Sequence, residues 1–484
     1  MKRAMTGSYL LSAFVLLALA ALAGCGAADA ALPIADLREI PQNCRAALGH
    51  GFADRTLIAP DVQTQLAREY RQVILSPWRD GYLPRSAGEV GAFFDKYARN
   101  PDCGENLVPR DAAWAGKMLP EANLAGYPNC RRRAITVRNT SIRQLPTAEC
   151  VFRPPGKGQG YPFDQLQESA LWANTPLFVA HVSAGGAWAW AESSFAAGWV
   201  PAADVAFVND AVVDAWRRHP LAAIVRDGVS LRGSDGAFIA TEHIGAVLPL
   251  ADASVAAGAG GGDGAQPAAG LEVLAAARMP DGLAKALRVR LQPGQAEMFP
   301  VPATTAWLAD LADRMIGQSY GWGGLYEQRD CSAMTRDLFA PLGLYLPRNS
   351  SEQARSGKVI PLGGMSGQTR QRLILRDAVP MLTLLGAPGH IMLYLGQRDS
   401  KALIMHNTWG VKVREPGGDE GYKLIGRCCI TTLAPGAELP NILLPEADLL
   451  RAIEVMVLLD GGDNFNRLKA SPFDRLRPSA ESDR

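Results

Sequence analysis

The stretch "YGWGGLYEQRDCSAM", residues 320–334, joins a glycine-rich turn to an acidic residue and a cysteine, and it decides how the C-terminal part of the chain folds. Asp330 precedes "CSAMTRDLFAPLG", in which apolar residues recur at helical spacing. Because an Asp at an N-cap accepts hydrogen bonds from the first free backbone amides, the pattern predicts a helix with Cys331 as its first residue. The positive end of such a helix lowers the pKa of a thiol, so Cys331 is a candidate nucleophile, with a buried structural cysteine as the alternative.

A cysteine nucleophile needs a base that takes its proton and an acid that protonates the leaving amine. Two histidines follow in segments with the composition of strands: His390 lies in "GHIMLYLG" and His406 in "LIMHNTWG". A five-residue hairpin loop over "GQRDS" (396–400) would place the two histidines directly opposite each other on one face of a sheet. Met392 and Ile404 would share that face, and one imidazole would orient the other.

In these residues the chain resembles the NlpC/P60 family, the papain-like cysteine peptidases of bacterial cell walls. The resemblance covers roughly residues 300–440. The motifs of that family occur in order, at Tyr320, Trp322, Gly323, Gly324, Asp330, Cys331, Ser332, Leu346, Pro347, Arg348, Ser350, Gln353, Gly389, His390 and His406.

The resemblance implies an α+β papain-like domain that hydrolyses the D-γ-glutamyl-diamino acid amide bond of peptidoglycan stem peptides or muropeptides. It implies that Cys331 attacks the carbonyl, that His390 is the base and that His406 orients it. It further implies an oxyanion contact from Tyr320 and substrate contacts from the residues Asp330, Ser332 and Ser350. In relatives of this kind the first barrel narrows the cleft and recognises a free L-Ala amine, and the candidates for that role here are Trp188, Trp190 and Glu192.

Upstream, near residue 134, the composition changes to short β-branched runs separated by turn residues. The phrases "VRNTSIR" (137–143) and "VRDGVSLR" (225–232) share one frame, which indicates two copies of a small β module. The resemblance identifies these as bacterial SH3-like barrels. The expected domains are a mainly helical region over 25–133, barrels over 134–215 and 216–299 with a flexible loop over 251–270, the peptidase over 300–445, and an extension with a polar tail over 446–484.

The N-terminus carries an export signal. Lys2 and Arg3 precede an apolar stretch too short to span a bilayer, and "LAGC" (22–25) resembles a bacterial lipobox. We therefore expect residues 1–24 to be a signal peptide and Cys25 to be lipidated, with a plain signal peptide as the alternative. Gly26 after the cysteine implies, by the same likeness, an outer-membrane anchor facing the periplasm.

Charge and cysteine spacing exclude other classes. A formal net charge of +1 argues against a nucleic-acid partner, and no Cys/His cluster has zinc-ligand spacing. We expect no metal, no cofactor and a monomer. The six cysteines other than Cys25 and Cys331 leave disulfide pairing open. Two other functions stay open as well: a non-catalytic peptidoglycan-binding lipoprotein, and a Cys-His acyltransferase or amidase acting on another substrate.

Overall fold

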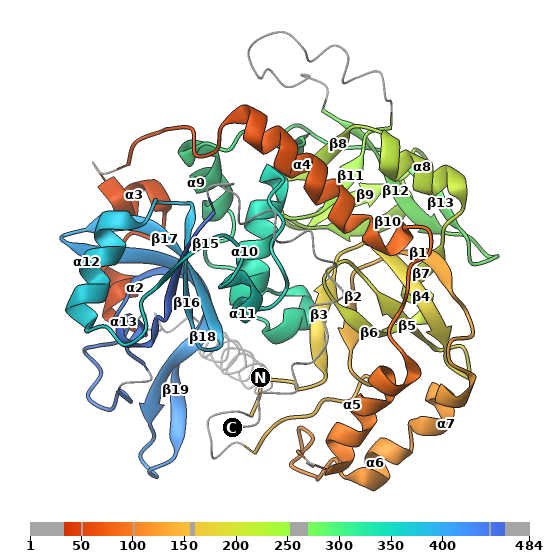
Figure 1. Ribbon diagram of the computed structural model, residues 1–484, viewed down its shortest axis with the longest axis horizontal. Coiled ribbons are helices and arrows are strands. Elements are labelled where there is room, and N and C mark those ends of the chain that lie inside the picture. Colours follow the sequence, from red (N-terminus) through yellow and green to blue (C-terminus); the bar gives the residue numbers. More distant parts are fainter. Residues whose placement is uncertain are drawn as a thin grey trace, which may run out of the picture.

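Figure 1 shows helices, two β-rich units and a larger α+β unit arranged around the helix that begins at Cys331. The computed structural model describes residues 33–49, 52–99, 102–154, 160–251, 270–444 and 447–459. The expected signal peptide, the lipidation site Cys25, most of the expected loop over 251–270 and the polar tail lie outside the described residues. None of the helices within those ranges has the length and apolarity needed to cross a bilayer.

The N-terminal region is mainly helical, as expected. Its helices are α2 (Ala35–Glu39), α3 (Cys44–Leu48), α4 (Pro60–Ile74), α5 (Ala87–Arg99), α6 (Ala112–Gly116) and α7 (Leu119–Ala122). The two ends of this region pack on different partners. Leu37 of α2 is buried with Val411 and Ile425 of the α+β unit, whereas Val90 and Phe94 of α5 are buried with Trp190 and other residues of the first barrel. The region therefore ties the peptidase to the first barrel.

The first barrel is an antiparallel seven-stranded sheet in the order β3-β2-β6-β5-β4-β1-β7. Its strands are β1 (Arg132–Thr136), β2 (Thr140–Arg143), β3 (Gln167–Leu171), β4 (Pro176–Val182), β5 (Trp188–Glu192), β6 (Ala197–Pro201) and β7 (Val205–Phe207). A 3₁₀ turn over Ala202–Asp204 separates β6 from β7, so the stretch "GWVPAADVAFV" (198–208) contributes to two strands and not to one.

The second barrel follows α8 (Asp210–Arg218) and encloses a small apolar core of its own. Its strands are β8 (Leu221–Ile224), β9 (Val229–Arg232), β10 (Phe238–Glu242), β11 (Val247–Pro249), β12 (Glu272–Arg278), β13 (Ala284–Arg290) and β14 (Ala296–Met298). Along β9, buried and exposed residues alternate, which is the pattern of a strand with one face on a core.

The two barrels meet at a buried carboxyl group. Glu242 of β10 is fully buried, and its Oε1 accepts a hydrogen bond from Asn174 Nδ2 of the first barrel at 2.7 Å. Burial raises the pKa of Glu242 from 4.5 to about 8. Between these pH values the folded state holds a proton that the unfolded state releases, so this group makes the protein less stable as the pH rises.

We therefore expect Glu242→Gln to be more stable than wild type near pH 8 and to lose part of the pH dependence between about pH 5 and 8. Urea unfolding across that range measures both effects. Glu272→Gln, at a half-exposed carboxylate of the same barrel, is the matched control and should leave the slope unchanged. A Glu242→Gln variant that is less stable near pH 8 would contradict a neutral buried carboxyl group.

The α+β unit has a six-stranded sheet in the order β15-β20-β16-β17-β18-β19. The strands are β15 (Lys358–Pro361), β16 (Thr383–Ala387), β17 (His390–Arg398), β18 (Lys401–Arg414), β19 (Glu420–Thr432) and β20 (Val455–Leu458). The helices are α9 (Thr305–Asp313), α10 (Cys331–Phe339), α11 (Ser350–Gln353), α12 (Gly367–Asp377) and α13 (Leu449–Ala452).

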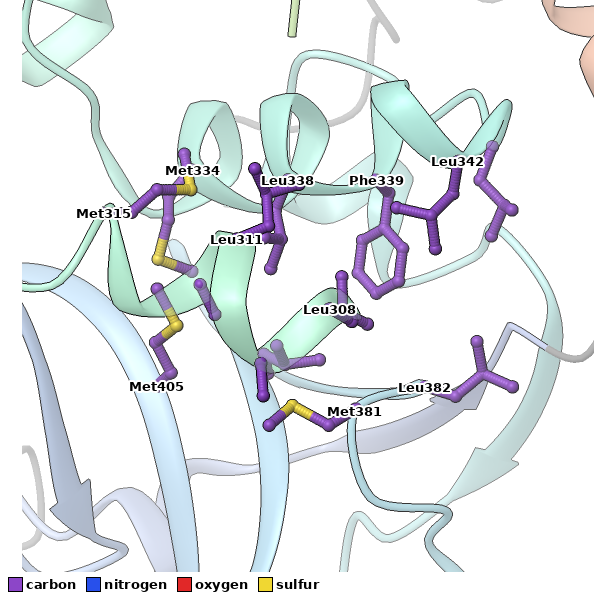
Figure 2. Packing of buried hydrophobic residues seen from close by; sticks show 14 of the residues in the cluster. Leu308, Leu311, Met315, Met334, Leu338, Phe339, Leu342, Met381, Leu382 and Met405 are labelled. Carbon is purple, nitrogen blue, oxygen red and sulfur yellow. The ribbon is translucent and has the colours of Figure 1, made fainter. Parts of the chain in front are cut away.

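Apolar packing holds α10 against α9 and the sheet. Leu308 and Leu311 of α9 lie against Leu338 and Phe339 of α10, and methionines fill the space towards β18 (Figure 2). A fully buried apolar side chain contributes about 1.5–3 kcal/mol relative to its exposed state, so this core fixes the helix that carries Cys331.

Candidate active site

The nucleophile helix begins where the sequence predicted. Asp330 is the N-cap of α10, and its side chain accepts a hydrogen bond from the amide of Ala333 at 2.8 Å. The amide of Gly323 donates to the other carboxylate oxygen at 3.0 Å, so the glycine-rich turn is bound to the same cap. Gly323 has φ of 60° and Gly324 has φ of 86°, values that favour glycine. Cys331 is consequently the first residue of the helix, next to its unpaired amides.

A buried ion pair supports this helix start. Arg348 donates to Asp330 Oδ2 at 2.7 Å and to Ser332 Oγ at 2.9 Å, and its Nε donates to Ser169 Oγ of the first barrel. Burial opposes ionisation of Asp330, but Arg348 and the amide donors more than offset it, and the pKa of Asp330 lies below its usual value. Asp330 is thus a carboxylate held by Arg348 and by backbone amides.

The two predicted histidines are in direct contact. His390 Nε2 and His406 Nδ1 are 2.9 Å apart, and His406 Nε2 is 3.1 Å from Thr431 Oγ1. The Thr431 hydroxyl donates to the carbonyl of Thr432, so its oxygen is left to accept from His406 Nε2–H. His406 Nδ1 must then accept from His390 Nε2–H. This chain leaves His390 Nδ1 with a free lone pair, which is the state of a general base.

The predicted hairpin register was wrong by two residues. The turn is Asp399–Ser400, both with positive φ, and the pairing Leu393↔Met405 shows that His390 and His406 are not directly opposite. The sequence reading missed that Asp and Ser can adopt this conformation in a two-residue turn. At the turn the pairing Arg398↔Lys401 is displaced by three residues from the prediction, and a bulge between Tyr394 and Gly396 reduces the displacement to two. Because side chains alternate with period two, this even displacement keeps both histidines on one face, as diagonal neighbours.

Met392 and Ile404 share the face of the histidines, as expected, and are buried there in a cluster with Ile374 of α12. The expectation about the thiol was wrong: burial, together with the Asp330 carboxylate, raises the pKa of Cys331 to about 12 instead of lowering it. Hydrogen bonds from the amides of Ile391 and Ser332 lower the thiol pKa, but their effect is smaller than that of burial, which removes water from around the thiolate.

The unliganded pair is therefore a neutral thiol and a neutral imidazole. Burial lowers the pKa of His390 to about 4, and burial with its neighbour His390 lowers that of His406 well below 6.5. Among the described residues, no hydrogen bond joins the Cys331 sulfur to an imidazole, but the amide next to His390, that of Ile391, bonds to the sulfur. Catalytic hydrogen bonds are often long in free enzymes and shorten when substrate binds.

The remaining predicted site residues differ in position. Tyr320 adjoins the site: its pKa is raised by burial and by the nearby groups of Asp330 and Cys331. Ser332 donates to Asp330 and accepts from Arg348, so it lies within the polar support of the helix. Ser350 begins α11, and the structure shows no side-chain hydrogen bond of it within the described ranges.

The first barrel forms one wall of the site through residues that the sequence reading missed. Gln167 donates to the carbonyl of Gly323, and Trp322 Nε1 donates to the carbonyl of Asp164. A Cβ on Gly324 would lie 2.4 Å from that of Ala170, so only glycine allows this approach.

Aromatic rings continue this wall. The ring of Tyr161, 61% exposed, meets Trp409 of β18 at 6.0 Å, and Trp409 meets Tyr320 at 6.1 Å. No local pattern in the sequence marks these two contacts, because they join residues 248 and 89 positions apart.

The candidates Trp190 and Glu192 for recognition in this barrel were wrong. Both are fully buried on the side of the N-terminal helices, where Glu192 accepts from the Tyr82 hydroxyl and the Arg85 amide. Trp188 packs with the same cluster. The face of the barrel that meets the peptidase is instead formed by β2 and β3 and the segment around Phe163.

Comparisons with known proteins agree with this arrangement. Residues 317–421 match the NlpC/P60 family, residues 13–127 the NLPC_P60 stabilising domain, residues 151–201 an SH3 domain of SH3b1 type and residues 209–254 one of SH3b2 type. An NlpC/P60 endopeptidase from Photobacterium damselae subsp. piscicida is similar in structure, with a TM-score of 0.76 and 23% identity over 87% of this chain and 97% of that one.

A further solved structure, an NlpC/P60 family protein from Bacillus cereus ATCC 10987, covers 68% of this chain and 99% of its own at 14% identity, with a TM-score of 0.42. No curated protein matches the chain.

The fold and the matches define a cysteine peptidase with an α+β catalytic domain, a helical N-terminal domain and two SH3-like barrels, and they confirm the predicted fold class. The chain is an NlpC/P60 family protein with an N-terminal stabilising domain and two bacterial SH3 domains.

The donor chain from His390 to Thr431 predicts unequal roles for the histidines. His390→Ala should lower kcat/KM by about 10³-fold, because it removes the base and the acid together. His406→Ala should cost less, because an imidazole without its orienting partner still accepts a proton. His219→Ala, at the C-terminal end of α8, is the matched control. Steady-state kinetics measures all three, and equal losses for the two site variants would contradict the division of roles.

Proposed function

We propose that the protein hydrolyses the amide bond between D-γ-glutamate and the diamino acid of peptidoglycan stem peptides, with Cys331, His390 and His406 as its triad. The observation that carries the proposal is the chain of donors from His390 through His406 to Thr431, next to a cysteine at a helix start. The likeness to a bacterial NlpC/P60 endopeptidase supports the choice of a wall peptide as substrate.

In this mechanism the Cys331 thiol transfers its proton to His390 Nδ1 as the sulfur bonds to the γ-glutamyl carbonyl carbon. The oxyanion receives hydrogen bonds from the Cys331 amide and the Tyr320 hydroxyl, each worth about 3 kcal/mol in comparable sites. His390 then gives the proton to the departing amine, which leaves a thioester. Water, deprotonated by the same imidazole, hydrolyses the thioester and restores the thiol.

This order of catalytic steps suits a thiol and an imidazole that are both neutral at the start. With the thiol pKa raised to about 12 and the His390 pKa lowered to about 4, charge separation is unfavourable before a substrate enters. The charges develop only as the carbonyl is attacked, when the helix N-terminus and the oxyanion donors stabilise them. Asp330 and Ser332, which the resemblance assigned to substrate binding, act in this proposal mainly by fixing the helix start.

The test is digestion of defined peptides. We expect L-Ala-γ-D-Glu-diaminopimelate to yield L-Ala-D-Glu and free diaminopimelate, read by mass spectrometry. Parallel digests with the lysine peptide, with an acetylated L-Ala amine and with a glycan-linked peptide would define the substrate class. Turnover of an unrelated acyl compound without cleavage of any γ-D-glutamyl peptide would favour a Cys-His acyltransferase or amidase and refute the proposal.

We also propose that the protein is anchored by a lipid on Cys25 at the outer membrane, facing the periplasm, because "LAGC" has the form of a lipobox. Cys25→Ser should then move the protein from the membrane fraction to the soluble fraction. Cell fractionation and immunoblotting measure the shift, with Cys130→Ser as the control. A Cys25→Ser variant that stays with the membranes would contradict the anchor.

A further inference from the structure

The residue before Asp330 connects the nucleophile to the histidine strand. The carbonyl of Arg329 accepts two hydrogen bonds, from the amide of Gly321 at 2.9 Å and from Asn407 Nδ2 at 2.8 Å. Asn407 directly follows His406 in β18. The peptide bond that leads into Asp330 and Cys331 is therefore fixed to the strand that carries one of the imidazoles.

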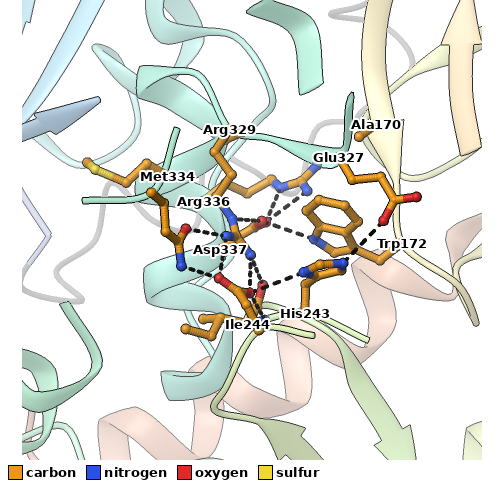
Figure 3. A network of polar contacts seen from close by, with 12 residues as sticks. Ala170, Trp172, His243, Ile244, Glu327, Arg329, Met334, Arg336 and Asp337 are labelled. Carbon is orange, nitrogen blue, oxygen red and sulfur yellow. Dashed lines mark hydrogen bonds and ion pairs between the residues drawn. The ribbon is translucent and has the colours of Figure 1, made fainter. Parts of the chain in front are cut away.

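The side chain of the same residue is buried and fully hydrogen-bonded. Arg329 is 3% exposed, and its Nε donates to Asp337 at 2.7 Å. Both Nη atoms donate to Asp227 at 2.9 Å, and their remaining hydrogens go to Gln318 Oε1 and to the carbonyl of Ile244. A guanidinium has five N–H donors, and all five are used here. Figure 3 shows the resulting network.

The acceptors come from different parts of the chain. Asp227 and Ile244 belong to the second barrel, whereas Asp337 lies on α10, six residues after Cys331. Trp172 of the first barrel donates to the same oxygen of Asp337 at 3.0 Å (Figure 3). Arg329 is thus the common partner of the second barrel and the nucleophile helix.

Close packing accompanies these polar contacts. Gly245 of the second barrel has φ of 101°, and a Cβ there would lie 2.8 Å from the side chain of Asp337. His243 stacks on Trp172 with ring centroids 4.4 Å apart, and its Nδ1 is 3.4 Å from Asp227. Burial opposes ionisation of Asp227, but Arg329 and His243 hold its pKa well below the usual value, so it is a carboxylate. The contact between the second barrel and α10 is therefore tightly packed around Arg329.

We propose that the second barrel is a working part of the active site, because its Asp227 holds Arg329 and thereby positions Cys331 against the histidine strand. Arg329 and Asp227 are positioning residues that do not touch the substrate. The proposal rests on Cys331 and His390 as nucleophile and base, as set out above. It assigns the barrel a role in kcat that is separate from any role in wall binding.

The expected effect follows from geometry. A reacting atom displaced by about 1 Å can lower a rate by about 100-fold, although the displaced group is intact. Asp227→Asn removes the charge from the bidentate pair and replaces one acceptor oxygen by an NH2 group, so one guanidinium donor loses its acceptor and the segment from Gly321 to Asp330 gains freedom. We expect kcat to fall by about tenfold or more with little change in KM.

The experiment compares Asp227→Asn and Asp227→Glu with Asp235→Asn, the same change at an exposed aspartate of the same barrel that bonds only to its own turn. Turnover of γ-D-glutamyl-diaminopimelate peptides is measured well below the melting temperature of each variant. The rate of Cys331 alkylation by iodoacetamide is measured against pH in the same samples, and circular dichroism measures the folded fraction of each sample.

Per folded molecule, Asp227→Asn should show the loss in kcat and a changed pH profile of Cys331 alkylation. Asp227→Glu should recover most of the activity, and Asp235→Asn should equal wild type. If Asp227→Asn lowers the melting temperature but keeps wild-type kcat and alkylation per site, the pair only stabilises the fold and the proposal is overturned. The alkylation profile does not depend on the peptide, so a wrong substrate assignment would remain distinguishable from a wrong positioning role.

Discussion

Replacing Cys331 with alanine is expected to lower kcat/KM for γ-D-glutamyl peptides by about 10⁴-fold or more, because the proposed thioester forms on the Cys331 sulfur. The base and the oxyanion donors would remain, but without the sulfur they can only assist direct attack by water. Such residual catalysis is small where a covalent route is normal. Hydrolysis of the peptides followed by mass spectrometry measures the loss.

Folding must be unchanged for that result to be informative. Cys331 is 7% exposed and lies at the first turn of α10, where alanine suits a helix, so the melting temperature should change little. Cys130→Ala, at a half-buried free thiol of the first barrel, is the matched control and should keep full activity. Persistent turnover by folded Cys331→Ala protein would remove the nucleophile assignment.

The second large effect is on stability. Arg348→Met should lower the free energy of unfolding near pH 7 by about 3–5 kcal/mol, because it leaves the buried Asp330 carboxylate without its charged partner. Arg348 also supports Ser332 and Ser169, so the helix start and the contact with the first barrel loosen together. Urea unfolding measures the change, and activity should fall because the N-cap of α10 is disturbed.

The pH dependence of this effect has a definite sign. In the wild type the folded-state pKa of Asp330 is lowered from the ordinary value of 3.8. The ionised carboxylate therefore contributes stability that is fully present above pH 3.8 and is lost as the pH falls from there through the lower folded-state pKa. In Arg348→Met the opposing effect of burial prevails, so Asp330 takes up a proton more readily. The stability difference should therefore be smaller near pH 5 than near pH 7.

Arg372→Met is the control for the loss of an arginine. Arg372 lies on α12, is exposed and makes one long contact to Thr369, so its replacement should cost less than about 0.5 kcal/mol. A loss for Arg348→Met as small as that of the control would show that the buried pair contributes little to the fold.

Local features were predictable where a short segment has one physical solution. The start of α10 at Cys331 follows from an Asp at an N-cap before a helical apolar pattern, and the expected helical character of the N-terminal region is seen in α4 and α5. The hairpin of β17 and β18 was harder, because a polar five-residue stretch allows either a long loop or a two-residue turn at its end. The face of the histidines survived the error because a bulge between Tyr394 and Gly396 converts the slip of three residues at the turn into an even slip of two.

The protonation state of the Cys331 thiol was less predictable than the register of the hairpin. The dipole of a helix N-terminus is a local property and favours a thiolate, but desolvation depends on everything that covers the sulfur. Around Cys331 the cover includes the sheet and the Asp330–Arg348 pair, which come from separate segments. The raised thiol pKa is therefore a consequence of tertiary packing that no segment of the sequence carries by itself.

The amino-acid sequence determined which side chains are available for catalysis and which secondary structure holds them, since N-caps, turns and the period of apolar residues act over a few positions. Only the tertiary structure decided that Thr431 fixes the tautomers of the histidine pair, that Arg348 neutralises Asp330, and that two barrels close on the same helix. These contacts join residues 18 to more than 150 positions apart, and their energies exist only after the chain has buried them together.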